Sequence, residues 1–266
     1  MKTEEYIKLI KEGNLTKAEE VRQSTIPAKL IKFFWLDGSE TDEKKFQTLA
    51  EDKIWFSHKQ FLNDPYEFKG MMIDRKKMSD AGYPEEVIEQ YREVLKFDGY
   101  GITCLSANAP DYLPMWAYYA NNHQGFCVEY TVIGKDCVRE VSYEPERIKV
   151  ASLIVEYVSA AREAMRLKKR TPKADLCCTI LIQNLFMKAE QWKHEKEYRI
   201  VYPIHKENGK NIPVRQLGLR TNRIIAGTKC RTESIERLNT ISNNLGLGNV
   251  YKSYIHPEKY TVKIEQ

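Results

Sequence analysis

Membrane-spanning and secretory segments are missing from this sequence. No stretch approaches the roughly 20 consecutive apolar residues that a membrane-spanning helix needs. The chain begins Met-Lys-Thr-Glu-Glu and has no apolar segment of the kind found in secretory signals. Its six cysteines include no C-x-x-C pair and offer no disulfide framework, which predicts free thiols. We therefore expect a cytoplasmic protein that does not enter a membrane.

The common signatures of catalysis and metal binding are missing as well. There is no Gly-rich phosphate loop, no H-E-x-x-H motif and no G-x-S-x-G motif. The five histidines are too scattered to suggest a metal site, so no metal is expected. No internal repeat, low-complexity tract or linker divides the chain. These absences leave the enzyme class open and favour a single folded domain.

Composition indicates a globular protein with a mild positive charge. Hydrophobic residues make up 42% of the 266 positions and aromatic residues 11%, which is ample for a packed core. The 42 Lys and Arg residues exceed the 37 Asp and Glu residues, and the net charge of +5 is spread along the chain. A nucleic acid or another anionic partner is therefore permitted but not required.

Helical and strand patterns alternate along the chain and predict an α+β fold. We expect a single domain of small mixed or antiparallel sheets flanked by helices, preceded by a helical N-terminal extension. The extension covers residues 1–26, and the α+β domain covers residues 27–266. Longer helices are expected at 148–170 and at 175–190.

Two strand connections are predicted from turn chemistry and proximity. Asn208-Gly209 lies between strand patterns at 198–203 and 212–217 and is the strongest hairpin signal in the chain. Residues 138–143 are expected to be the antiparallel partner or a neighbour of the strand Phe126–Val132.

Three charged residues stand where a helical pattern changes into a strand pattern. Glu197 and Arg199 alternate with apolar and aromatic residues, so they share one face of the strand. If the strand begins at Glu195, the carboxylates of Glu195 and Glu197 lie about 6–7 Å apart, at roughly 3.3 Å per residue. They repel each other unless a cation, a ligand or Arg199 lies between them. A functional site would explain this arrangement, and the alternative is a solvated ladder of Glu and Arg on an edge strand.

A second group of candidate residues follows the strand-like segment Ile54–Ser57. Asn63-Asp64-Pro65 has the chemistry of a turn, because Asn and Asp side chains bond to their own backbone and the residue before Pro avoids helix. Such a turn can hold Asn63, Asp64 and Glu67 rigidly against a ligand. The alternative is a turn with a purely structural role.

The helical segment Met115–His123 carries the third group. At helical spacing Trp116 and Tyr119 lie on one side and Tyr118 on another, which indicates a partly exposed aromatic surface. The alternative is a core helix with amphipathic tyrosines.

Taken together, these stretches resemble a bacterial family of proteins of unknown function, DUF2971. The most specific pieces are F-x-N-D-P-x-E and M-W-x-x-Y-A-x-x-H-x-G-F-C, and the resemblance spans roughly residues 30–230. The matching stretches are 54–57 with 61–67, 101–106, 115–130 and 192–200. Members of the family occur beside anti-phage and toxin-like genes, so the resemblance implies a role in defence or in a toxin-type system.

A second resemblance is to the ADP-ribosyltransferase fold, in which split sheets hold NAD and a glutamate of an E-x-E motif opens a late strand. Glu195-Lys196-Glu197 has that form. The resemblance implies that NAD is the substrate, that Glu197 is the catalytic carboxylate and that Glu195 orients an acceptor. Lys32 departs from the His or Arg that the first strand of such folds usually supplies. The expected cofactor-binding residues are Lys32, Asn63, Asp64, Glu67, Trp116, Tyr119, His123 and Arg199.

These functional hypotheses share one structural requirement. If the stretches form one site, Asn63, Trp116, Tyr119 and Glu197 converge on a single concave surface. Two alternatives to the NAD-using enzyme stay open. One is a non-catalytic sensor that binds a nucleotide or a protein, and the other is an enzyme that processes nucleic acid.

Overall fold

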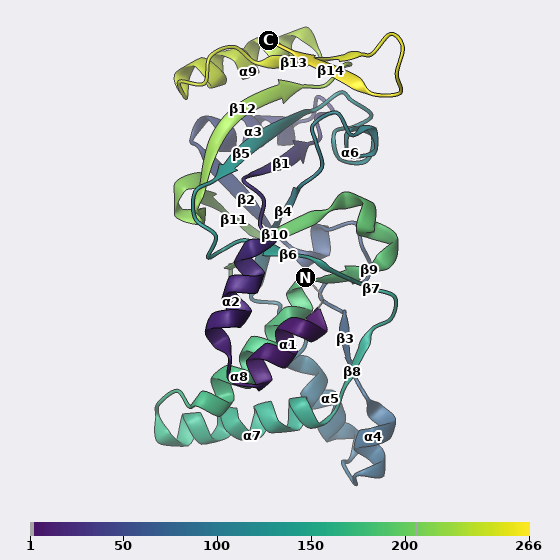
Figure 1. The fold of residues 1–266 in the computed structure, drawn as a ribbon, viewed down its shortest axis with the longest axis vertical. Helices are drawn as coiled ribbons and strands as arrows, with labels where there is room; N and C mark the ends of the chain where they lie inside the picture. Colours follow the sequence, from purple (N-terminus) through teal and green to yellow (C-terminus); the bar gives the residue numbers. More distant parts are fainter. Residues whose placement is uncertain (1–2, 206) are drawn as a thin grey trace.

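The computed structural model describes residues 3–205 and 207–266. A large sheet fills the upper part of the view in Figure 1, and most of the helices gather below it. The lower helices are α1 (Thr3–Lys11), α2 (Leu15–Ser24), α4 (Arg75–Asp80), α5 (Glu85–Glu93), α7 (Ser152–Leu167) and α8 (Pro172–Leu181). The upper helices are α3 (Glu40–Ala50), α6 (Leu113–Tyr119) and α9 (Thr232–Asn244).

The predicted helical N-terminus is confirmed. Gly13, with a φ of +75°, lies between α1 and α2, where an L side chain would be strained. Helix α1 packs its buried residues Tyr6 and Ile10 against Ile180 of α8. This apolar contact attaches the N-terminal helices to the helical region rather than to the large sheet.

The large sheet has ten strands in the order β11-β2-β4-β1-β5-β12-β13-β14, with β10 paired to β4 and to β6. Its pairs are antiparallel except for β12 with β13, so the α+β class is confirmed. The strands are β1 (Lys29–Phe34), β2 (Lys53–His58), β4 (Tyr100–Ser106), β5 (Phe126–Val132), β6 (Arg139–Glu140), β10 (Glu197–Pro203), β11 (Gly209–Pro213), β12 (Leu219–Ala226), β13 (Tyr251–Ile255) and β14 (Val262–Glu265).

Two small parallel sheets connect the large sheet to the helices. One pairs β3 (Met71–Ile73) with β8 (Ile148–Val150), and the other pairs β7 (Ser142–Glu144) with β9 (Met187–Ala189). Strand β9 leads through a 3₁₀ helix, Glu190–Glu195, into β10. Strand β10 therefore lies where the two regions of the molecule meet (Figure 1).

The large sheet divides along β4. One edge of β4 pairs with β10 over the whole length of both strands. The other edge pairs with β2 at Ile102 and with β1 at Ser106. Between these two points, β1 and β2 leave β4 in different directions and form a fork. A fork of this kind exposes the middle of a central strand, and it is the framework of the site described below.

Both long helices predicted for residues 148–190 are shorter than expected. The first begins only at Ser152, because the β-branched residues Ile148 and Val150 form β8 instead. The second ends at Leu181, and a short 3₁₀ helix and β9 follow it. The buried side chain of Asn184 donates to the carbonyl of Phe68 at 2.6 Å and accepts from the Met71 N–H at 2.7 Å. These bonds tie the chain that follows α8 to another segment.

The predicted hairpin at Asn208-Gly209 is wrong. Strand β11 pairs with β2, and β10 pairs with β4 and β6. Gly209 does not have the positive φ of a tight hairpin turn. It begins β11 instead, where a Cβ atom would lie 2.1 Å from the Trp55 ring and 2.5 Å from the Phe56 carbonyl oxygen. Glycine is needed here for close approach of two strands rather than for a turn.

Residues 138–143 also have different partners from those expected. Both edges of β5 are occupied, one by β1 and the other by β12. Strand β6 pairs with β10 and strand β7 pairs with β9. The segment therefore joins the region around the charged residues of β10.

Candidate functional site

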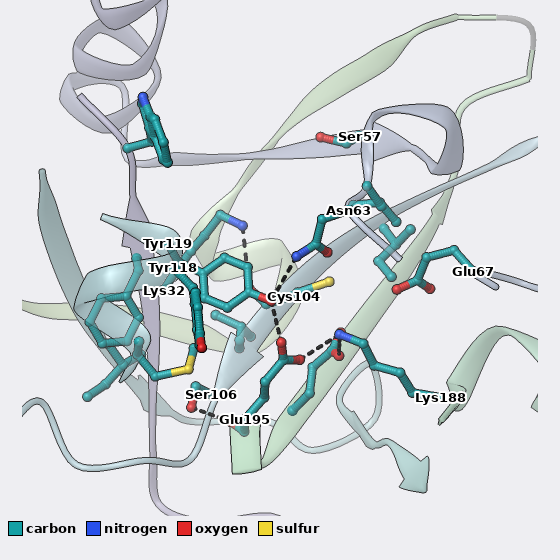
Figure 2. A pocket seen from close by; sticks show the side chains of 18 of the residues that line it. Lys32, Ser57, Asn63, Glu67, Cys104, Ser106, Tyr118, Tyr119, Lys188 and Glu195 are labelled. Carbon is teal, nitrogen blue, oxygen red and sulfur yellow. Dashed lines mark hydrogen bonds and ion pairs between the residues drawn. The ribbon is translucent and has the colours of Figure 1, made fainter. Parts of the chain in front are cut away.

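A cavity of about 400 Å³ lies in the fork between β1, β2 and β4 (Figure 2). This volume falls within the range of roughly 300–1,000 Å³ that is typical of small-molecule sites. Helix α6 and the loop after β2 complete its walls. Polar residues that line it are Lys32, Ser57, Asn63, Glu67, Cys104, Ser106, Tyr118, Tyr119, Lys188, Glu195 and Glu197.

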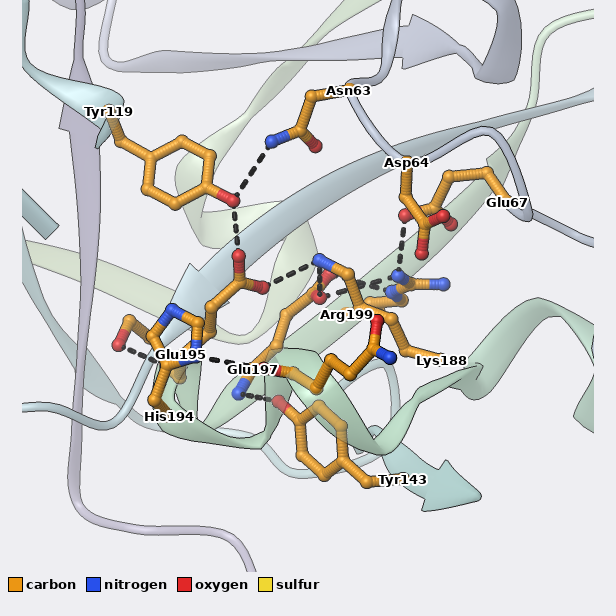
Figure 3. Close-up of polar contacts among 12 residues, drawn as sticks. Asn63, Asp64, Glu67, Tyr119, Tyr143, Lys188, His194, Glu195, Glu197 and Arg199 are labelled. Carbon is orange, nitrogen blue, oxygen red and sulfur yellow. Dashed lines mark hydrogen bonds and ion pairs between the residues drawn. The ribbon is translucent and has the colours of Figure 1, made fainter. Parts of the chain in front are cut away.

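Lys188 is the cation that separates the two carboxylates of the E-x-E sequence (Figure 3). Its Nζ lies 2.5 Å from Glu195 Oε2 and 3.0 Å from Glu197 Oε2. The three side chains are at most 4% exposed. Strand β10 begins at Glu197 rather than at Glu195, and the left-handed residue Lys196 turns the chain between them. Both carboxylates nevertheless reach the same ammonium group.

Arg199 forms the second half of this buried charged cluster. Its Nε lies 2.7 Å from Glu197 Oε1, and its Nη2 lies 2.9 Å from Glu67 Oε1. Its Nη1 donates to the Leu185 carbonyl at 2.8 Å. The Arg199 side chain is fully buried, so the alternative of a solvated ladder on an edge strand is wrong. Strand β10 is paired on both sides at this point, with β4 and β6.

The charges in the cluster shift the pKa values of its members in opposite directions. Burial disfavours the charged form of Glu197, but Arg199 and Lys188 outweigh burial and lower the pKa of Glu197 to about 2. For Glu67, burial outweighs the attraction of Arg199 and raises the pKa. Burial opposes the charge of Lys188, yet the two carboxylates raise its pKa. Glu197 and Lys188 are thus stably ionised, while Glu67 holds a proton more readily than Glu197 does.

Tyr119 and Asn63 connect the cluster to the wall of the cavity. The Tyr119 hydroxyl donates to Glu195 Oε1 and accepts from Asn63 Nδ2 at 3.1 Å. Burial and the neighbouring Glu195 raise the pKa of Tyr119, so its phenol stays neutral and keeps donating. On the far side, the Glu197 N–H donates to the Tyr143 hydroxyl at 2.7 Å. The position of each carboxylate is therefore fixed by several partners.

The structure brings six of the ten candidate residues together. Those that line the cavity are Lys32, Asn63, Glu67, Tyr119, Glu195 and Glu197. The expected convergence therefore holds for Asn63, Tyr119 and Glu197, which come from three distant segments. It fails for Trp116, which is fully buried beneath helix α6. The Trp116 indole donates to the Pro110 carbonyl at 2.7 Å, and its ring packs edge-on against Phe33.

Three other candidates also lie outside the cavity wall. Asp64 has the structural role, since its Oδ1 accepts from the Tyr66 N–H at 2.8 Å. His123 stacks on Trp116 and lines a separate cavity beside Lys229. Arg199 lies behind the wall, where it contacts Glu67 and Glu197.

Lys188 is the main residue that the sequence pattern did not single out. It lies within the predicted helix 175–190, where a single lysine reads as a solvated side chain. One feature of the sequence could have identified Lys188 as a candidate. It is the only charged residue in the stretch 176–189. Cys104 was also missed; it lines the cavity, and burial together with Glu197 raises the pKa of its thiol well above its usual range.

The site thus defines an α+β protein with a ligand-sized cavity that has buried carboxylates in its wall. Comparison with known proteins finds a family match for part of the chain. The model of DUF2971, described as a protein of unknown function, matches residues 115–200. This confirms the family resemblance for a segment that contains most of α6, Lys188 and both carboxylates, and this segment is narrower than the expected span of 30–230. No curated protein and no solved structure matches the chain.

Within residues 3–205 and 207–266, no helix has the length and apolar character to cross a membrane. In the same part of the chain, no group of three or more His, Cys, Asp or Glu side chains is placed to hold a metal ion.

Proposed function

We propose that this protein is an enzyme that uses NAD as its substrate and breaks the bond between nicotinamide and ribose, as an ADP-ribosyltransferase does. Breaking this bond creates an oxocarbenium-like transition state with positive charge on the ribose. A carboxylate fixed in advance stabilises that charge more strongly than it stabilises the ground state. The observation that carries the proposal is the pair of buried carboxylates that Lys188 holds at the cavity.

We assign Glu195 to the stabilisation of the ribose and Glu197 to the support of the cluster. The E-x-E resemblance implies instead that Glu197 is the catalytic carboxylate and that Glu195 orients an acceptor. Both partners of Glu195, namely Tyr119 and Lys188, themselves line the cavity. Glu197 is bound at one oxygen by Arg199 and at the other by Lys188 and Arg199. Glu197 is held by two cations, of which Arg199 lies behind the cavity wall, whereas Glu195 is held by a phenol and an amine that both line the cavity. Glu197 is therefore the less free of the two carboxylates to respond to a ligand.

Lys32 is the cation on the opposite side of the cavity. It comes from β1, and its Nζ donates to the Cys104 carbonyl at 3.4 Å, inside the fork of the sheet. Burial lowers the pKa of Lys32, so its ammonium group loses a proton more readily than that of an exposed lysine. In the proposed complex Lys32 binds the oxygens of the nicotinamide ribose, the role that a His or Arg fills in the resembling fold.

The proposed reaction needs no acid for the leaving group. When the N-glycosidic bond breaks, its electron pair goes to the pyridinium nitrogen, and nicotinamide leaves as a neutral molecule. The acceptor attacks the ribose carbon and loses a proton. The protein then supplies orientation and electrostatic stabilisation, which are the tasks that a rigid buried cluster performs. A function in anti-phage defence or in a toxin-type system is part of this proposal and rests on the family resemblance alone.

A second candidate function is a binding module without catalysis, and one observation favours it. Each oxygen of Glu195 and of Glu197 already has a hydrogen-bond or ion-pair partner. Carboxylates that are satisfied in this way can hold a nucleotide without reacting. The third hypothesis, an enzyme that processes nucleic acid, has no supporting observation of this kind and stays a prediction from the charge of the chain.

The test is to incubate the purified protein with NAD and to follow free nicotinamide, with calorimetric titration of NAD in parallel. Release of nicotinamide supports the enzyme. Binding of NAD without release supports the binding module. Neither binding nor release would remove NAD from both proposals.

A further inference from the structure

Three large aromatic side chains line the cavity and are unusually exposed for residues of their kind. Trp35 is 44% exposed, Phe61 is 59% exposed and Tyr118 is 61% exposed. The polar cluster lies in the same cavity wall at Lys188, Glu195 and Glu197, whose side chains are nearly inaccessible. The cavity therefore has a buried charged floor and an exposed aromatic mouth, formed by Trp35, Phe61 and Tyr118.

The three rings of the aromatic mouth come from three separate parts of the fold. Trp35 directly follows β1, Phe61 ends the 3₁₀ helix Lys59–Phe61, and Tyr118 belongs to α6. Among the described residues, neither Trp35 nor Phe61 takes part in a ring-to-ring contact. Their faces are thus not covered by one another or by other aromatic side chains. Exposed apolar groups gathered around a cavity are typical of ligand sites.

We infer that the aromatic mouth stacks the planar base of a nucleotide while the charged floor holds the attached ribose. For NAD, the base is nicotinamide, because the proposed function places the nicotinamide ribose at the floor. The adenine of AMP is a planar base that serves as the probe of the same stacking. Only the identification of the nucleotide as NAD rests on the proposed function. Aromatic side chains stack on nucleobases through the π faces that all bases carry, and one such contact changes affinity by about tenfold or more. A cavity with an aromatic mouth and a carboxylate floor fits a ligand that is flat at one end and hydroxylated at the other.

The experiment compares two ligands that differ by the base alone. AMP and ribose 5-phosphate are titrated separately into the full-length protein by calorimetry. The ratio of their dissociation constants measures the contribution of the base. We expect AMP to bind about tenfold or more tightly than ribose 5-phosphate, and we expect this ratio to fall toward one in Trp35→Leu.

The chain offers closely matched controls for exposed aromatic residues outside the cavity. Trp55 is 43% exposed and Tyr66 is 56% exposed, against 44% for Trp35 and 59% for Phe61, and neither control residue lines the cavity. Trp55→Leu therefore matches Trp35→Leu, and Tyr66→Leu matches Phe61→Leu. Thermal unfolding of all four variants shows whether the fold is retained, and Phe61→Leu replaces Trp35→Leu if the latter does not fold.

The outcomes separate this inference from the proposed function. A ratio that falls in Trp35→Leu and Phe61→Leu but not in their controls supports a base-stacking mouth, whether or not NAD is turned over. Equal binding of AMP and ribose 5-phosphate, no measurable binding of either, or an equal fall in the control variants overturns it. Release of nicotinamide from NAD together with any of these three results would leave the proposed function standing and the base-stacking mouth refuted.

Discussion

Glu197→Gln is the substitution that tests the buried charged cluster most sharply. It keeps the size of the side chain and removes one negative charge. Arg199 is then left with Glu67 as its acidic partner, and Lys188 is left with Glu195. Because burial raises the pKa of Glu67, that carboxyl is a weak substitute for the lost charge. We therefore expect both cations to be poorly compensated in a buried setting.

The lost ion pair and the lowered pKa of Glu197 correspond to similar losses of stability. Removing one partner of a buried ion pair typically costs about 3–5 kcal/mol in the free energy of unfolding. The pKa of Glu197 falls from 4.5 to about 2, and at about 1.4 kcal/mol per pKa unit this corresponds to roughly 3 kcal/mol. We expect Glu197→Gln to lower the free energy of unfolding by about 3 kcal/mol at pH 7.

Equilibrium unfolding in urea measures this difference, with Glu163→Gln as the control. Glu163 is an exposed glutamate of α7, far in the chain from the cluster, and its substitution is expected to change stability by less than about 0.5 kcal/mol. A surface ion pair contributes less than about 1 kcal/mol to the free energy of unfolding. A loss of that size in Glu197→Gln would therefore refute a buried cluster held by this carboxylate.

Four further predictions concern the pH dependence of stability, the thiols, Cys104 and Glu195. Because the folded-state pKa of Glu197 lies below its unfolded value of 4.5, its stabilising effect is present above pH 4.5 and is lost as the pH falls toward 2. The stability difference between wild type and Glu197→Gln, measured in urea, should therefore shrink over that range, and a constant difference would contradict the shift. In a thiol titration of the folded protein, the exposed Cys137 and Cys178 should react first. In denaturant all six cysteines should react, and fewer than six reactive thiols would indicate a disulfide. Cys104 lines the cavity but should react slowly in the folded protein, because burial raises the pKa of its thiol. Mass spectrometry measures the rate at which Cys104 is labelled, and a rate as fast as that of the exposed cysteines would contradict this prediction. Glu195→Gln should lower turnover of NAD by about 10²–10³-fold with little change in calorimetric affinity, and equal losses of both would point to a role in binding.

Local patterns were sufficient to predict the elements that carry most of the site. The apolar alternation of residues 102–106 and 126–132 predicted β4 and β5, which are central strands. The alternation after Glu197 predicted β10 and the shared face of Glu197 and Arg199. The repulsion between Glu195 and Glu197 predicted that a cation, a ligand or Arg199 lies between them, and the structure places the cation Lys188 there. These inferences depend only on periodicity and on Coulomb's law, which act over short stretches of sequence.

The identity of that cation could not be predicted, because it depends on contacts between distant segments. Lys188 reaches the carboxylates only because the chain leaves the helical path before it, where Asn184 bonds to Phe68 and Met71. The Asn208-Gly209 hairpin failed for a similar reason. Gly209 is required for the approach of β11 to Trp55, a residue more than 150 positions earlier, and a local turn signal contains no information about that contact.

The same limit applies to α6. Its spacing correctly indicated an aromatic helix with a partly exposed surface, since Tyr118 is exposed and Tyr119 reaches Glu195. The pattern did not show which aromatic residue faces the sheet. Trp116 occupies that position and packs against Phe33, so it belongs to the core rather than to the site.

The proposal that this protein breaks the bond between nicotinamide and ribose is tested most directly by the release of nicotinamide from NAD. Wild-type protein, Glu195→Gln and the surface control Glu163→Gln are incubated with NAD under the same conditions, and free nicotinamide is quantified over time by chromatography. The proposal predicts steady release by wild type and Glu163→Gln, and release slower by about 10²–10³-fold in Glu195→Gln. Equal release by all three proteins would remove Glu195 from catalysis, and no release by wild type that binds NAD would contradict the enzyme itself.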